Sequence, residues 1–236
     1  FAVLAGRDAA AARHAVEAGA ALPRVAVSLR SPSPVAELTA ENRLATVGAA
    51  VLLREGGAVL TAEDPPYSGS TASHWSVRWQ AGVAREAADL GLDLDAVEPR
   101  TATVVRNGRG VLRLGGPRPA TAAAWRERVL AWFDAGRHDV LLTPAVAGPP
   151  VRAGAMRHRG YLSTTVLSAS RVPYTQAWNL AGVPAVVVPV CVSGRPVAVQ
   201  LVGRPGDELA LLATAARIEG WEVPDARLGR TATGAP

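Results

Sequence analysis

The sequence predicts an α/β fold, with a mixed, largely buried sheet flanked by helices. Short valine-rich runs alternate along the chain with longer segments in which apolar residues recur every three or four positions. The runs are typical of buried strands and the longer segments of amphipathic helices, so their alternation indicates helices on both faces of a sheet. Apolar residues make up 49% of the 236 residues, enough to fill such a core.

The N-terminal part of the chain is expected to hold two helices and two strands. Asp8 is a candidate cap for the first helix, and the glycine pair Gly56-Gly57 ends the second. RVAVSL alternates like a short buried strand, and AVLTAEDPPY resembles a strand that leaves the core into a polar loop. In order, these elements are a helix at 1–21, a strand at 24–29, a helix at 35–57 and a strand within 58–67.

The middle of the chain is less regular. One helix is expected within 68–95, where glycine and aspartate mark its exit. Residues 102–116 have two interpretations, a hairpin around Asn107-Gly108 or a helix that leads into a loop. A strong amphipathic helix follows Pro119, and a buried strand, DVLLTPAV, comes directly after it. The apolar side of that helix consists of Trp125, Val129, Trp132 and Phe133.

The last third returns to strands and helices after a segment, 144–160, that is rich in proline and glycine. The elements expected here are a helix at 161–171, strands at 184–190 and 194–203, and a helix at 207–219. No internal repeat or linker is evident, so a single α/β domain is expected over 1–236. Because the chain starts at Phe1 and its only methionine is Met156, we expect this domain to be incomplete at its N-terminal side.

Composition argues against several classes of protein. The net charge is +5, but the 25 basic residues, all arginine, are scattered rather than gathered into a nucleic-acid-binding stripe. Cys191 is the only cysteine, so no disulfide framework can form within the chain. No apolar stretch approaches the length of a membrane span, and the N-terminal stretch lacks the features of a signal peptide. We expect a cytoplasmic protein that binds neither nucleic acid nor membrane.

The residues of the chain offer no convincing reaction centre. Ser68, Ser70, Ser73 and His74 are close in sequence, but a polar loop explains them better than a catalytic triad does. The four histidines are widely separated and show no metal-ligand spacing, and no phosphate-binding glycine loop is present in the sequence. We therefore expect no metal and no cofactor.

Three ordered segments near the C-terminus resemble the C-terminal portion of the amidase signature family. They are DVLLTPAVAGPP, PYTQAWNLAGVPAVVVPV and GRPVAVQLVGRPGDELALLATAARIE. A weaker match, FAVLAGRD followed by RVAVSL, resembles the family just past its catalytic centre. The resemblance implies a hydrolase that cleaves carboxylic amides, C–N bonds other than peptide bonds, through a Ser–cis-Ser–Lys triad, with backbone N–H groups binding the oxyanion.

That triad cannot be assembled from these residues. The sequence has no lysine and no glycine- and serine-rich loop of the family's type. The resemblance therefore places the catalytic residues outside this chain, in a missing N-terminal half. It implies that this chain forms the core scaffold and one wall of the substrate cleft, and that the chain alone is inactive.

The segment WNLAGVPAVVVPV raises the question of what its turn faces. Gly182 and Pro184 break the chain between a helix and a strand, and this lets backbone approach a cleft closely. Four residues around the turn are the candidates for substrate binding: Tyr174, Thr175, Trp178 and Asn179. Two alternatives stay open, a core position for Trp178 and a bridge between backbone groups for Asn179. Gln200 in the next strand needs a hydrogen-bond partner, structural or at the site, if it is buried.

The resemblance also bears on the substrate. In the family's glutamine-dependent tRNA amidotransferase subunit an acidic residue before the asparagine binds the glutamine ammonium, whereas Val172 stands near that position here. This favours a general, more apolar amide or ester-like small-molecule substrate and makes the amidotransferase role the less favoured alternative. A non-catalytic scaffold or binding module derived from the fold is a second alternative. The expected partners are the substrate and the missing half, and assembly as a homodimer is left open.

Overall fold

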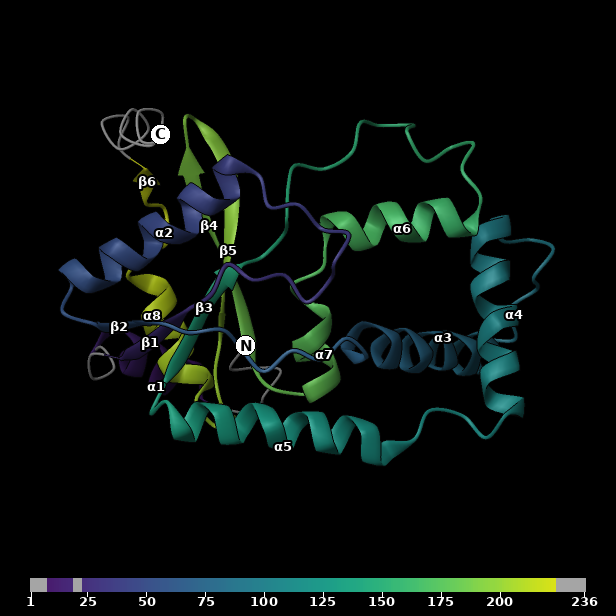
Figure 1. Cartoon of the computed structure of the whole chain (residues 1–236), viewed down its shortest axis with the longest axis horizontal. Helices are drawn as coiled ribbons and strands as arrows, with labels where there is room; N and C mark the ends of the chain where they lie inside the picture. The colour runs from purple at the N-terminus through teal and green to yellow at the C-terminus, as the bar shows by residue number, and fades with distance from the viewer. Residues whose placement is uncertain (1–7, 19–22, 224–236) are drawn as a thin grey trace.

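A computed structural model describes residues 8–18 and 23–223, and within them a mixed six-stranded sheet forms the body of the molecule (Figure 1). Its strand order is β2-β1-β3-β5-β4-β6. The pairs β1–β2, β1–β3 and β4–β6 are parallel, and β3–β5 and β4–β5 are antiparallel. The strands are β1 Arg24–Val27, β2 Val59–Ala62, β3 Val140–Pro144, β4 Ala185–Val192, β5 Arg195–Val202 and β6 Glu222–Val223.

Helices cover the sheet on two sides, so the predicted α/β fold with a mixed, flanked sheet is confirmed. One core cluster joins the sheet to α2 and α8, and a second joins its other face to α5 and α7. The helix α1 packs on α8. These helices are α1 Ala9–Glu17, α2 Ala40–Glu55, α5 Pro119–Ala135, α7 Gln176–Ala181 and α8 Glu208–Ala216.

Successive side chains of a strand point to opposite faces of the sheet, so neighbouring residues belong to different cores. In β3, Leu142 belongs to the α2 and α8 cluster, whereas Leu141 belongs to the α5 and α7 cluster. The amphipathic side predicted for α5 is confirmed, since Trp125, Val129 and Phe133 are buried there and Trp132 packs against the same cluster.

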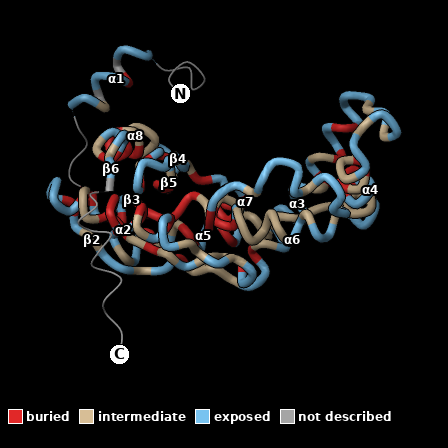
Figure 2. Tube along the Cα trace, turned by 90° about the horizontal axis from the view of Figure 1, so that it is seen from above, coloured by how far each residue is buried: buried red, intermediate tan, exposed pale blue. Residues whose placement is uncertain are grey.

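A helical arm extends from the body of the molecule (Figure 2). It consists of α3, α4 and α6, and α7 contacts α3 at the base of the arm. The arm helices are α3 Thr71–Asp89, α4 Pro99–Arg113 and α6 Tyr161–Arg171. None of the helices in the described ranges is both long and apolar enough to cross a membrane.

The hairpin interpretation of 102–116 is wrong, because these residues belong to the helix α4 and its exit. The structure requires glycine at position 108 for packing between helices and not for a turn. A β-carbon there would lie 2.0 Å from the carbonyl oxygen of Gln80 and 2.7 Å from the β-carbon of Ala84, both on α3. Glycine therefore allows α3 and α4 to cross closely.

The start of another helix differs from the expectation. The helix predicted from residue 35 begins at Ala40, because the N–H of Thr39 bonds the carbonyl of Ala147 at 2.8 Å and holds the preceding segment outside the helix. At the first helix, the Asp8 carboxylate accepts the N–H of Ala10 at 2.7 Å, as expected of a cap. Parts of the predicted helix, 1–7 and 19–21, lie outside the described residues.

Candidate functional site

The turn that follows α7 is held by an arginine from α5. Gly182 adopts φ 63° and ψ 38°, a left-handed conformation that favours glycine, and its N–H bonds the carbonyl of Trp178 at 2.8 Å. The Arg126 Nη1 donates to the carbonyls of Ala181 at 3.2 Å and Gly182 at 2.7 Å. The turn therefore faces a guanidinium group that donates to two of its carbonyls. No local pattern in the sequence points to Arg126, because the contact spans more than fifty residues.

Tyr174 lies in the interior and joins two distant parts of the chain. Its side chain is fully buried, and its hydroxyl donates to the carbonyl of Leu29 at 2.9 Å. Burial raises the pKa of Tyr174 to about 12, an effect that the Arg43 guanidinium partly opposes. The neutral phenol thus ties the segment before α7 to the loop after β1.

Gln200 supplies the second connection to this segment. It is buried in the middle of β5, and its Nε2 donates to the Thr143 Oγ1 on β3 and to the carbonyl of Tyr174, both at 3.3 Å. The Thr143 hydroxyl donates in turn to the carbonyl of Pro144 at 3.0 Å. The lone polar group in VAVQLVG is therefore satisfied structurally, the first of the two interpretations left open for it.

Trp178 occupies a core position in an aromatic cluster. Its side chain is 1% exposed, and its ring centroid lies 5.8 Å from that of Tyr67 and 6.5 Å from that of Trp125. The Trp125 Nε1 donates to the carbonyl of Ala177 at 2.7 Å. Among the residues that the structure describes, neither the Trp178 Nε1 nor the Tyr67 hydroxyl has a hydrogen-bond partner.

Tyr67 was missed by the sequence analysis. It follows β2 in a proline-rich loop, and nothing in its local pattern indicates that it packs against α5 and α7. Burial, together with the nearby Tyr174 and Asp64, raises the pKa of Tyr67 above its usual range. Tyr67 is therefore a neutral member of the cluster around Trp178.

The other two predicted residues keep some exposure. Thr175 is half-buried at the start of α7, and its carbonyl accepts the N–H of Asn179 at 3.2 Å. Asn179 is exposed on α7, and within the described part of the chain no side-chain bridge from it across the turn is present. The structure thus groups the four predicted residues on one short segment, with Tyr174 and Trp178 facing inward.

A cavity of about 690 Å³ adjoins this segment at the base of the helical arm. Its walls come from α3, α4 and α6, and it reaches Val172 and Gln176 on either side of Tyr174. None of the four predicted residues lines it. Volumes of this size are typical of small-molecule sites.

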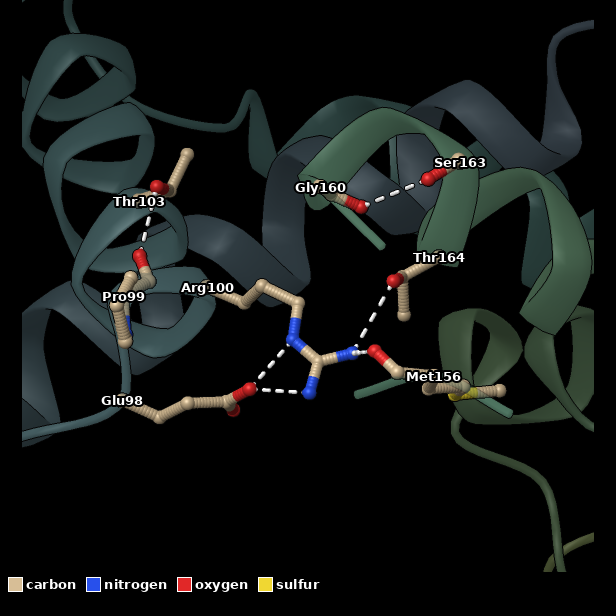
Figure 3. A network of polar contacts seen from close by, with 8 residues as sticks. All are labelled: Glu98, Pro99, Arg100, Thr103, Met156, Gly160, Ser163 and Thr164. Atoms are coloured by element: carbon tan, nitrogen blue, oxygen red, sulfur yellow. Dashed lines mark hydrogen bonds and ion pairs between the residues drawn. The ribbon is translucent and has the colours of Figure 1, made fainter. Parts of the chain in front are cut away.

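Arg100 and its partners Glu98, Met156 and Thr164 line part of the cavity. Figure 3 shows the polar contacts of this arginine. Arg100 at the start of α4 is paired with the carboxylate of Glu98. Its Nη1 also donates to the carbonyl of Met156 at 2.8 Å and to the Thr164 Oγ1 at 3.2 Å. One guanidinium therefore joins α4, α6 and the loop between β3 and α6.

The serine-rich stretch before α3 forms a local network. The Ser68 Oγ lies 3.2 Å from the Ser70 Oγ and 3.0 Å from the Thr71 Oγ1, and the Ser73 Oγ donates to the carbonyl of Ser70 at 2.9 Å. His74 is exposed on α3, and in the described ranges no hydrogen bond joins it to these hydroxyls. Across residues 8–18 and 23–223 no group of three histidine, cysteine or acidic side chains could hold a metal ion.

Comparison with known proteins shows the family of the chain. Residues 118–212 match the family model described as Amidase. This range includes α5, the turn after α7 and the three strands β3, β4 and β5. The candidate amidase AmiB2 of Mycobacterium tuberculosis is 40% identical over 201 residues, which cover 83% of this chain and 43% of AmiB2. The chain belongs to the amidase signature family. A second M. tuberculosis relative, the candidate amidase AmiA2, is 34% identical over 165 residues, covering 67% of the chain and 33% of AmiA2.

A solved amidase-fold structure shows the same architecture. The 6-aminohexanoate cyclic dimer hydrolase superposes with a TM-score of 0.71 at 23% identity, covering 88% of this chain and 46% of that one. This amidase-family chain spans less than half the length of AmiB2 and of that hydrolase. The chain thus shares its fold with part of a longer protein.

Proposed function

We propose that the protein is an amide hydrolase that cleaves small, uncharged carboxylic amides, and that this chain forms its core scaffold and one wall of its substrate cleft. The observation that carries the proposal is the 40% identity to a candidate amidase along 201 residues. The turn and the segment before it lie within that match to the family, and Gln200, Tyr174 and Arg126 fix their position.

The catalytic groups of the proposed reaction come from outside this sequence. A Ser–cis-Ser–Lys triad requires a lysine, and these 236 residues contain none. The relatives are more than twice as long as the stretch they share with this chain, which leaves room for the triad elsewhere. We expect the chain alone to be inactive. Its expected protein partner is the missing N-terminal half that carries the triad.

The segment from Tyr174 to Asn179 is the proposed substrate-binding segment. Tyr174 and Trp178 hold it from the interior, whereas the Thr175 hydroxyl and the Asn179 amide keep the exposure that contact with a ligand requires. Val187 on β4 is 51% exposed on the same side of the sheet as Gln200, with which it is paired in register. This exposed apolar side chain is available to further protein that covers the same side of the sheet.

The residues that line the cavity beside the proposed substrate-binding segment favour an uncharged substrate. Val172, near the position where the amidotransferase subunit carries an acid, is partly exposed and lines the cavity. A substrate ammonium would find no carboxylate at Val172, and Glu98, the acidic residue of the cavity lining, is already paired with Arg100. Transamidation of glutamine is therefore disfavoured, and a non-catalytic scaffold remains the alternative to be tested.

The test is labelling with a serine-reactive fluorophosphonate followed by peptide mass mapping. The chain alone is expected to form no adduct, and the full-length protein is expected to form one on a serine outside these residues. Heat-denatured full-length protein serves as the control and should not react. A stoichiometric adduct on a serine within 1–236 contradicts an external nucleophile, and no adduct on the folded full-length protein supports the scaffold instead.

A further inference from the structure

The cavity at the base of the helical arm has an aromatic wall. Trp75 and Trp79, one turn apart on α3, stack with their ring centroids 5.6 Å apart and their planes 4° apart. Both rings line the cavity, and Trp79 is 40% exposed. An exposed tryptophan face beside a second tryptophan leaves a flat apolar surface without a cover, which is favourable for stacking a planar ring.

The charged side chains of the lining are already engaged in other bonds. All residues that line the cavity lie in the described part of the chain, and Glu98 and Arg100 are the charged groups among them. These two are paired with each other, and the Arg100 Nη1 already donates to Met156 and Thr164. A ligand charge of either sign would therefore have to compete with bonds already made.

The cavity also shares a wall with the proposed substrate-binding segment. Gln176 lines the cavity and is next in sequence to Thr175. The volume of about 690 Å³ exceeds what a simple amide group fills and suits a substituent of one or two rings. A substrate that lies along this segment can thus place one end in the cavity.

We propose that this cavity binds a neutral, planar aromatic substituent of the amide substrate, stacked on Trp79. That the bound ring belongs to a substrate rests on the proposed amide hydrolysis, whereas the binding site itself is inferred from the cavity and its lining. The tryptophan pair sets the preference for a flat ring, and the paired Glu98 and Arg100 set the preference for a neutral one.

The test is isothermal titration calorimetry of the full-length protein with N-(2-naphthyl)acetamide. The matched ligand is 6-acetamido-2-naphthoate, which keeps the rings and adds a negative charge. Binding of the neutral amide is expected to weaken about 10-fold in Trp79→Ala, because the stacking face is lost. The control is Val77→Ala, a partly exposed residue of α3 that does not line this cavity, and it should bind like the wild type.

Three results would overturn the proposal. They are equal affinity of Trp79→Ala and wild type, equal affinity for the charged and neutral ligands, and no heat of binding in the folded wild type. The hydrolase proposal can fail separately. If binding depends on Trp79 but the full-length protein is not labelled by the fluorophosphonate, the binding site is supported and the hydrolase proposal is not. Hydrolysis of the neutral naphthyl amide with the same KM in Trp79→Ala and wild type keeps the hydrolase and removes this site.

Discussion

The Gln200 Nε2 donates to the carbonyl oxygen of Tyr174 at 3.3 Å and thereby ties the central sheet to the segment that precedes α7. The same nitrogen donates to the Thr143 Oγ1 on the neighbouring strand, also at 3.3 Å. Both bonds are slightly longer than the usual N–H···O distance of about 2.7–3.2 Å, and both are buried. One amide group thus fixes the spacing between two strands and the proposed substrate-binding segment.

Gln200→Leu is expected to lower the free energy of unfolding by about 1–3 kcal/mol, because it leaves the Tyr174 carbonyl and the Thr143 hydroxyl without this donor. Urea unfolding measures the change. The double variant with Thr143→Val should be less destabilised than the sum of the two single variants, since both share one hydrogen bond. Strict additivity would show that the two side chains do not interact.

Gly108→Ala is expected to destabilise the protein by about 1–3 kcal/mol, because the new methyl group meets backbone of α3 that cannot move aside. Gly110→Ala in the same helix is the matched control. Its β-carbon meets nothing within 4 Å, so the higher helix propensity of alanine should stabilise α4 by about 0.5–1 kcal/mol. Thermal unfolding of both variants decides, and equal effects would refute the close crossing.

Alkaline pH is expected to destabilise the fold through its buried tyrosines. Tyr174 has its pKa raised to about 12 in the folded chain and keeps an ordinary pKa near 10 when unfolded. The unfolded state therefore loses its proton first, and the stability present below pH 10 declines as pH rises toward 12. Because the sequence has no lysine, tyrosines dominate titration in this window.

Tyr174→Phe tests this dependence. Its free energy of unfolding should fall less steeply between pH 10 and 11 than that of the wild type, by up to about 1.4 kcal/mol per pH unit. Urea unfolding at pH 8, 10 and 11 gives the two slopes, and pH 8 records the separate loss of the bond to Leu29. Parallel slopes would show that Tyr174 does not carry the effect.

Arg100→Gln is expected to loosen the loop between β3 and α6 without unfolding the sheet. The variant loses the pairing with Glu98 and the bond to the Met156 carbonyl, so trypsin should cut after Arg157 about 5- to 10-fold faster. Mass spectrometry of timed digests measures the rate. Arg106→Gln, on an exposed part of the same helix, should leave this rate unchanged. Equal rates in both variants would mean that Arg100 does not hold the loop.

Asn179→Ala in the full-length protein is expected to raise KM about 3- to 10-fold for a neutral amide, with little change in stability, because the side chain is exposed. Steady-state kinetics and thermal unfolding of the same preparation separate the two effects. Arg195→Ala, at the exposed start of β5, is the control for a surface change. An unchanged KM would remove Asn179 from the substrate-binding segment.

Much of the fold could be predicted because its elements carry local patterns. The helix α5 and the strands β3, β4 and β5 follow from apolar periodicity alone, since burial of an apolar face drives their formation. Gly108 misled one interpretation, because a glycine required for a close helix crossing looks in sequence like a glycine required for a turn. The late start of α2 depends on the bond from Thr39 to Ala147, which no local pattern reveals.

Four features could be predicted or read directly from the sequence: the α/β class, the order of the main elements, the lack of lysine and the segment that carries the family resemblance. Other features became visible only in three dimensions: Tyr174 and Trp178 face inward, Arg126 donates to the carbonyls of the turn, and Tyr67 joins the aromatic cluster. The same holds for the cavity between the arm helices and its stacked tryptophans. The physical reason is range: periodicity reports which face of an element is buried, whereas side-chain partners depend on contacts between elements distant in the chain.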